Sequence, residues 1–165
     1  MRFVRTLTLV IAAVLTVAPS LETHAEVTHL SESDRSVLEH PDAFTQVNRV
    51  GGIPKSVIRA IADASHDPEF RLADPGQEWQ ETDVIVEPRL SRRRLVFAAS
   101  TPEYWLIHYE LGGYSHSYHL VLVEGNPGSE KVVWRATMFE MVASMREIPS
   151  LLASKELSDN PADGF

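Results

Sequence analysis

The sequence predicts an α+β fold: an antiparallel β-meander of about five strands, with an N-terminal and a C-terminal amphipathic helix packed on one face of the sheet. Three observations support this prediction. Apolar residues recur at helical spacing after Pro54, short β-branched and aromatic segments divided by Gly and Pro turns fill the second half, and an apolar stripe follows near the C-terminus. A run of strands joined by short turns forms a meander, and helices on either side of it in the chain cover its apolar surface.

Residues 1–25 have the three parts of a cleavable signal peptide. Two arginines make a positive start, a central segment is apolar except for two threonines, and small residues precede the expected cut. An apolar stretch of about a dozen residues suits a signal peptide and is shorter than the roughly 20 that a membrane-spanning helix needs. We expect cleavage after Ala25, with a cut after Ser20 as second choice; the alternative is a buried apolar helix. The sequence therefore predicts an exported protein, periplasmic or secreted, without a membrane anchor after cleavage.

Residues 26–165 are expected to form a single globular domain, with an irregular segment over residues 26–52 and a frayed tail over residues 158–165. The chain has 165 residues, no cysteine and a formal net charge of −8 at pH 7. Without cysteine there is no disulfide framework, no thiol catalysis and no zinc site built from cysteine. The net acidity argues against nucleic acid and against anionic membrane surfaces as partners.

Two helices are predicted before the strands. Residues 31–40 hold one short helix inside the irregular segment. A second, amphipathic helix begins at Pro54, because proline suits the first helical position, and it carries Val57 and Ile61 on its apolar side. Pro68 ends it, since the residue before a proline avoids the helical conformation.

The strands are predicted from β-branched and aromatic composition. A polar connection precedes them, and its Trp79 is expected to attach the loop to the core. Gly112 and Gly113 form the expected two-residue hairpin turn. A final helix is expected near Pro149, and the methionines before it fit either a helix or a continued strand. The five predicted strands are residues 84–86, 95–99, 104–111, 114–123 and 131–137.

A turn at Gly112 and Gly113 places His108, Glu110 and His119 on one face of the hairpin. Two imidazoles and a carboxylate with an open position form a known zinc arrangement, and they also resemble the triad that holds non-haem iron. The interpretation that we favour is simpler: these residues occupy the solvent-exposed face of an antiparallel sheet. No cofactor is then expected, and zinc or iron is the alternative.

Arginines gather around the start of the second predicted strand of this acidic chain. Arg92 and Arg94 share one strand face there, and Tyr104 lies on the exposed face of the hairpin. These three are the candidate partner-binding residues, because guanidinium groups bind carboxylates and phosphates bidentately. The alternative, which we favour for the arginines, is that they keep a sheet edge from pairing with another chain.

The hairpin also carries a family resemblance. The run from His108 to Gly113 (HYELGG), followed by His116, Tyr118 and His119, resembles a pattern of exported bacterial proteins of unknown function. The resemblance covers most of residues 50–155. It implies export and supplies no activity, cofactor or site.

No catalytic signature stands out. Ser115 is outside any G-x-S-x-G elbow, and the chain has no Gly-rich phosphate loop. We therefore expect a non-enzymatic binding module for a protein or peptide partner outside the cytoplasm. One alternative is a metal-binding protein or metal-assisted enzyme using the His/Glu/His cluster. The other is a small-ligand pocket between sheet and helices, marked by Trp79, Trp105 and Trp134.

Overall fold

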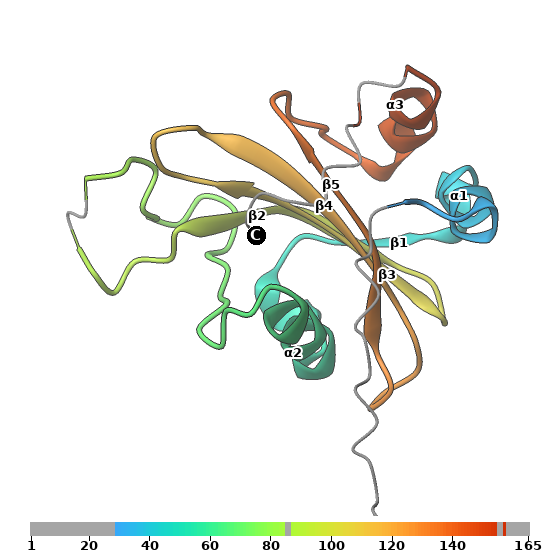
Figure 1. Ribbon diagram of the computed structural model, residues 1–165, viewed down its shortest axis with the longest axis horizontal. Helices are drawn as coiled ribbons and strands as arrows, with labels where there is room; N and C mark the ends of the chain where they lie inside the picture. Colours follow the sequence, from blue (N-terminus) through green and yellow to red (C-terminus); the bar gives the residue numbers. More distant parts are fainter. Residues whose placement is uncertain (1–28, 85–86, 155–156, 158–165) are drawn as a thin grey trace, which may run out of the picture.

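The computed structural model describes residues 29–84, 87–154 and 157 (Figure 1). It shows an α+β fold with a five-stranded antiparallel sheet and a few short helices. The predicted signal peptide over residues 1–25 and the predicted frayed tail lie outside the described residues. Within the described part of the chain, no helix is long and apolar enough to cross a membrane.

The strands follow one another in the sheet in the order of the sequence, each antiparallel to its neighbours. The four long strands confirm the predicted meander. The first predicted strand, residues 84–86, is not one of the five strands of the sheet: Val84 lies exposed in a bend, and residues 85–86 lie outside the described residues. The fifth is a three-residue edge strand that pairs with the end of the first long strand. The strands are β1 (Thr45–Val47), β2 (Arg93–Ser100), β3 (Tyr104–Leu111), β4 (Ser117–Glu124) and β5 (Lys131–Met138).

Local signals place the helices. Ser31 caps the first helix, where its Oγ accepts a hydrogen bond from the amide of Asp34 at 3.1 Å. The second helix begins directly after Pro54, as predicted, and buries Val57 and Ile61. The helices are α1 (Glu32–Leu38), α2 (Lys55–Ala64) and α3 (Ile148–Ser154), and the 3-10 turns are η1 (Pro41–Ala43), η2 (Val50–Gly52) and η3 (Met145–Glu147).

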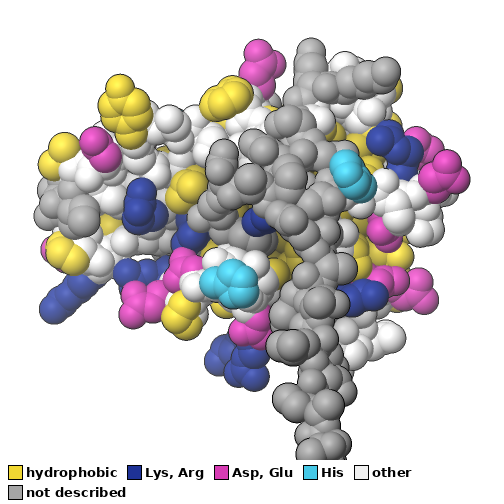
Figure 2. All heavy atoms as spheres, viewed as in Figure 1, with side chains coloured by type: hydrophobic (Ala, Val, Ile, Leu, Met, Phe, Trp, Pro, Cys, Tyr) yellow, Lys and Arg dark blue, Asp and Glu magenta, His cyan; other side chains and the backbone are white. Residues whose placement is uncertain are grey.

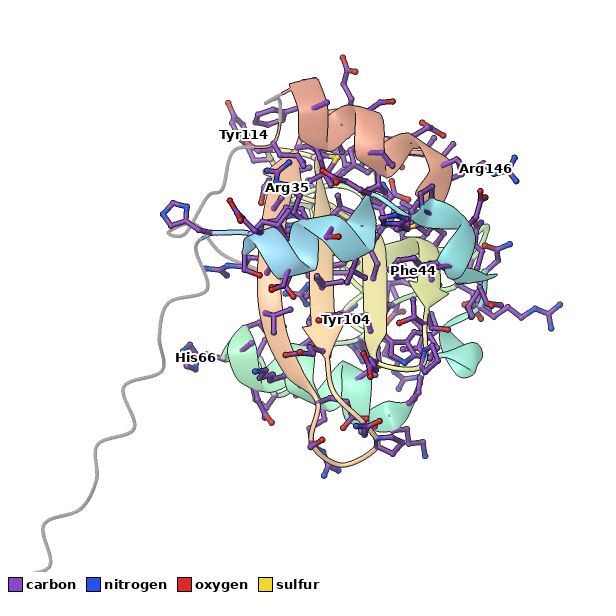
Figure 3. The ribbon with its side chains drawn as sticks, turned by 90° about the vertical axis from the view of Figure 1, so that its right-hand side faces the viewer. Arg35, Phe44, His66, Tyr104, Tyr114 and Arg146 are labelled. Atoms are coloured by element: carbon purple, nitrogen blue, oxygen red, sulfur yellow. The ribbon has the colours of Figure 1, made fainter. Side chains whose placement is uncertain are left out.

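Helices cover both faces of the sheet, which corrects the prediction that the N-terminal and C-terminal helices share one face. The core on one face joins Ile61 of α2 to Ile107 of β3. The core on the other joins Leu38 of α1 and Ile148 of α3 to Leu106 of β3. Figure 1 shows α2 on the opposite side of the sheet from α1 and α3, and Figure 3 shows α1 lying across the strands beside α3. Two layers are needed because consecutive residues of β3 are both apolar, so that each face must be buried.

The hairpin register also differs from the prediction. Leu111 pairs with Ser117, so the connection is the five-residue loop 112–116 rather than a two-residue turn. As a result, His108 pairs with Leu120, and His119 pairs with Tyr109. The pairing moves by an odd number of residues, which turns every side chain of one strand to the other face.

Contacts with a distant part of the chain explain the longer loop. The amide of Gly112 donates to the carbonyl of Arg92 at 3.0 Å, and the amide of Gly113 donates to that of Glu81 at 3.0 Å. Gly112 is packed so closely that a Cβ atom there would lie 2.1 Å from the carbonyl oxygen of Gln80. Gly113 has a φ of +137°, which favours glycine. Both glycines thus seat the hairpin on the segment before β2, and the chain reverses beyond them.

The close packing at Gly112 predicts that a single added methyl group lowers the stability of the fold strongly. Gly112→Ala should lower the free energy of unfolding by about 2 kcal/mol, because the backbone of Gln80 must move to admit the Cβ atom. Urea unfolding measures this change. Gly51→Ala is the matched control, since a Cβ atom at that position has no neighbour within 4 Å. Equal losses in the two variants would contradict the close approach.

Candidate functional site

The observed register separates the two histidines of the predicted metal site. His108 is fully buried, and its ring meets that of Phe97 edge to face with the centroids 5.3 Å apart. Its Nδ1–H donates to the carbonyl of His119 at 2.9 Å, and its Nε2 accepts from the amide of Val142 at 3.3 Å. Both bonds are made by a neutral imidazole, and burial lowers the pKa of His108. His108 therefore fastens the segment after β5 to the sheet.

His119 is buried on the other face of the sheet. Its ring stacks on that of Tyr109, with the centroids 5.0 Å apart and the planes 9° from parallel. Its two nitrogens lie 3.0 Å from Ser117 Oγ and 3.3 Å from Thr137 Oγ1. Burial, followed by nearby positive charge such as that of Arg93, lowers the pKa of His119 to about 4. His119 is therefore neutral at physiological pH.

The structure does not bring the predicted zinc or iron ligands together. His108 and His119 point to opposite faces, and Glu110 lies on the His108 face. Across residues 29–84, 87–154 and 157, no group of three or more His, Cys, Asp or Glu side chains is placed to hold a metal ion. Glu110 interacts with Arg94 and His116 instead.

Glu110 is a buried carboxylate at the end of β3, and each of its oxygens accepts from a different side chain. Arg94 Nε donates to Oε1 at 2.5 Å, and His116 Nε2–H donates to Oε2 at 3.0 Å. Trp79 covers both donors: its ring centroid lies 4.8 Å from the Arg94 guanidinium carbon and 5.7 Å from the His116 ring centroid. Burial of a charge is tolerated only when partners satisfy it, so the four residues depend on one another. We call them the Glu110 cluster.

The Glu110 cluster begins a row of residues that crosses the sheet. Arg94, Glu110, Tyr118 and Met138 lie opposite one another on β2, β3, β4 and β5. Neighbouring strands lie about 4.8 Å apart, so the row spans roughly 14 Å. The side chains of Arg94 and His116 are 32% and 36% exposed, so solvent reaches this part of the cluster.

The large exposed apolar side chains gather at the same end of the sheet. We call this the loop end: residues 79–84 and 92–94 around the start of β2, the loop 112–116, and residues 139–142 after β5. In the part of the chain that the structure describes, four large hydrophobic side chains are exposed. Val84 belongs to the segment that packs against the hairpin, and its carbonyl accepts a hydrogen bond from the side-chain Nε2 of Gln80. The four are Val84 (65%), Tyr114 (94%), Phe139 (81%) and Met141 (56%).

The candidate partner-binding residues fall into two places. Arg92 is exposed at the loop end, where its Nη2 lies 3.2 Å from the position of a Cβ atom on Gly113. Figure 2 shows several Lys and Arg side chains on the left of the molecule, where Figure 1 places the loop end. Tyr104 lies at the other end of β3, roughly 20 Å from Glu110 at about 3.4 Å per residue. Figure 3 shows Tyr104 well apart from Tyr114. The loop end therefore includes Arg92 and Arg94 but not Tyr104.

The Tyr104 hydroxyl is hydrogen-bonded within the fold. The hydroxyl oxygen lies 3.3 Å from a carboxylate oxygen of Asp34 and 3.2 Å from one of Glu124, and its single proton is shared between these two acceptors. Burial, with the charges of Glu124 and Asp34, raises the pKa of Tyr104 to about 12. Tyr104 thus ties α1 to the sheet.

Sequence reasoning missed Tyr114, His116 and Phe139 as surface residues. The assumed register assigned Tyr114 and His116 to the core face, while Phe139 had no pattern to mark it. Trp79 was expected to attach its loop to the core, and in the structure it is buried against Arg94. An aromatic residue in a polar loop was thus a further signal for the cluster, beside Glu110 and Arg94, which the sequence had assigned to two separate candidate sites.

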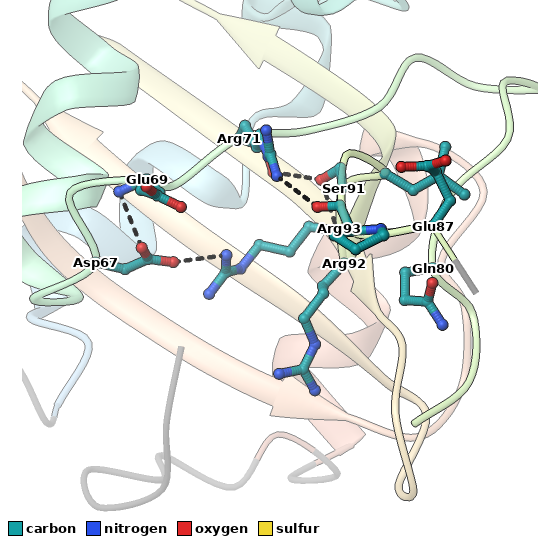
Figure 4. A pocket seen from close by; sticks show the side chains of 10 residues that line it. Asp67, Glu69, Arg71, Gln80, Glu87, Ser91, Arg92 and Arg93 are labelled. Carbon is teal, nitrogen blue, oxygen red and sulfur yellow. Dashed lines mark hydrogen bonds and ion pairs between the residues drawn. The ribbon is translucent and has the colours of Figure 1, made fainter. Parts of the chain in front are cut away.

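A small pocket lies beside the loop end, under the segment that precedes β2 (Figure 4). Its volume is about 210 Å³, below the roughly 300–1,000 Å³ of usual ligand sites. Charged side chains line it, and Arg93 Nη1 donates to Asp67 at 2.8 Å across it. The predicted markers of a ligand pocket, Trp79, Trp105 and Trp134, are not among its described lining residues.

His119 predicts a loss of stability in acid. Its folded-state pKa of about 4 lies below the unfolded value near 6.5, so the unfolded chain takes up the proton first as the pH falls. The stability that neutral His119 contributes is complete above pH 6.5 and is lost as the pH falls toward 4. The loss of unfolding free energy over this window should be about 3 kcal/mol larger for the wild type than for His119→Gln.

Chemical denaturation at a series of pH values measures this difference. His66→Asn is the control, because His66 is exposed and asparagine tolerates its φ of 53°. This variant should keep the wild-type slope. A His119→Gln slope equal to that of the wild type would contradict the argument.

Comparison of the chain with protein-family models, with curated proteins and with solved structures finds no match. The assignment of a function therefore depends on the geometry of the Glu110 cluster and the loop end.

Proposed function

We propose that the protein is an exported, non-enzymatic binding module that contacts a protein or peptide partner through the loop end of its sheet. One observation carries the proposal: within the described residues, the four exposed large hydrophobic side chains all belong to this end. Exposed apolar groups that gather in one region are typical of interaction sites, whereas scattered ones need no explanation.

The residue types of the loop end suit an interface. Tyrosine, tryptophan, methionine and arginine are enriched in the centres of protein interfaces. Tyr114, Met141 and Arg92 are exposed at the loop end, and Trp79 packs against Arg94.

The loop end is also held in place before any partner arrives. Backbone hydrogen bonds from Gly112 and Gly113 fix both the loop and the segment that faces it. The Glu110 cluster holds His116 at the end of the same loop. A preorganised surface loses less conformational entropy on binding, which favours affinity.

A photo-cross-linking amino acid at position 114 tests the proposal in the organism that makes the protein. We expect an adduct with a discrete partner protein from position 114 and from position 139. Position 59 is the control, because Arg59 is exposed on α2, away from the loop end. Adducts at 59 alone, or none at 114 and 139, would contradict the proposal.

Export is tested separately. The mass of the protein isolated from the cell envelope or the medium should correspond to a chain that begins at Glu26, with Leu21 as the second choice. A full-length chain found in the cytoplasm would overturn the proposed export without bearing on the binding surface.

A further inference from the structure

A groove at the loop end lies between the segment after β5 and α3. It has a volume of about 530 Å³, and its walls include Met138, Met141 and Val142 on one side and Leu151 on the other. Phe139 also lines it and is 81% exposed. Methionine side chains are flexible and adapt to irregular apolar ligands. The groove can thus accept an apolar side chain at one end of the row that crosses the sheet.

The charges around the groove are negative. Glu140 and Glu147 line it, and its described lining contains no Lys or Arg. Glu147 is fixed there, because its carboxylate accepts from Ser144 Oγ at 3.1 Å and from the amide of Ala143 at 3.4 Å. An acidic group of a ligand is therefore repelled from this end of the row.

Two arginines, Arg94 and Arg92, lie near the other end of the row. Arg94 uses its Nε for Glu110, and its Nη groups make no hydrogen bond or ion pair with the residues that the structure describes. The Trp79 ring packs against the guanidinium, whose carbon lies 4.8 Å from the ring centroid. Arg92 is exposed in the bend before β2, next to Gly113, and also lines the small pocket that includes Glu87. It adds a positive charge that Glu110 does not neutralise. A carboxylate is the ligand group that guanidinium geometry favours.

We infer that the loop end binds an extended partner segment that places a carboxylate on Arg92 and Arg94 and an apolar side chain in the groove beside Met138. The row spans roughly 14 Å, and an extended chain advances about 3.3 Å per residue, so the acidic and apolar residues lie about four positions apart. The inference rests on the proposed function and adds the chemistry and the orientation of the partner.

The protein's own C-terminal residues do not match this chemistry. Residues 158–165 carry two aspartates and no lysine or arginine, and Phe165 ends them. The only large apolar residue of this stretch, Phe165, lies two positions from Asp163 and six from Asp159, and neither spacing matches the four positions that the row requires.

Fluorescence anisotropy with a labelled peptide tests the inference on the mature full-length protein. The probe has two aspartates, a short Gly-Ser spacer and two leucines, and both chain directions are tested. We expect saturable binding at micromolar to millimolar concentration, and at least tenfold weaker binding of the same peptide with lysines in place of the aspartates.

Surface variants locate the binding. Arg92→Glu should weaken the acidic peptide at least tenfold, and so should the double change Phe139→Ser with Met141→Ser. All three residues are exposed, so these substitutions spare the core. Arg146→Glu is the charge-matched control, because its side chain is 83% exposed and lies beside Asp42. This variant should change the affinity less than twofold.

The inference is overturned if neither orientation of the acidic peptide binds, if the lysine peptide binds as tightly, or if Arg92→Glu keeps the wild-type affinity. The inference is also overturned if a variant that ends at Leu157 binds the acidic peptide tenfold more tightly, because the chain's own residues 158–165 would then compete for the groove. Cross-links from positions 114 and 139 would still support the loop end as a binding surface in each of these cases. Their absence, by contrast, contradicts the proposed function itself.

Discussion

The close seating of Gly112 on the backbone of Gln80 is the constraint on which the rest of the loop end depends. It leaves no room for a Cβ atom, and it holds in place the residue pairs that join the start of β2 to the end of β3. The chain then reverses over residues 112–116, and β4 returns in a register that puts His108 and His119 on opposite faces. A contact between backbones far apart in the sequence thus decides the direction of every side chain in the hairpin.

The two buried histidines show what that register produces. Each has hydrogen-bond partners within the fold, and each is held neutral by burial. Their hydrogen bonds connect the strands to one another and to the segment after β5. The cost of burying them appears in acid, where the unfolded chain gains a proton that the folded chain excludes.

Glu110 links the fold to the proposed surface. A buried carboxylate requires donors, and it takes them from β2 and from the loop 112–116. Arg94 and His116 are therefore held beneath and beside Trp79, while the neighbouring Arg92 remains exposed. In a chain with a formal net charge of −8, this exposed basic group beside exposed apolar side chains favours recognition of an acidic, partly apolar segment.

Local chemistry in the sequence determined most of the elements. Ser31 and Pro54 marked the helix starts, and β-branched and aromatic composition marked the four long strands. Three residues at Thr45–Val47 carry too little pattern to predict an edge strand, and the β-branched run that begins at Val84 predicted one where the structure has a bend at Val84. The predicted convergence of His108, Glu110 and His119 was wrong for a related reason: with Leu106 and Ile107 both apolar, alternation could not reveal which face each histidine takes. Only the tertiary structure decided the register, the opposite placement of α2 and α3, and the meeting of Trp79 with Arg94, because these depend on contacts between segments that lie apart in the sequence.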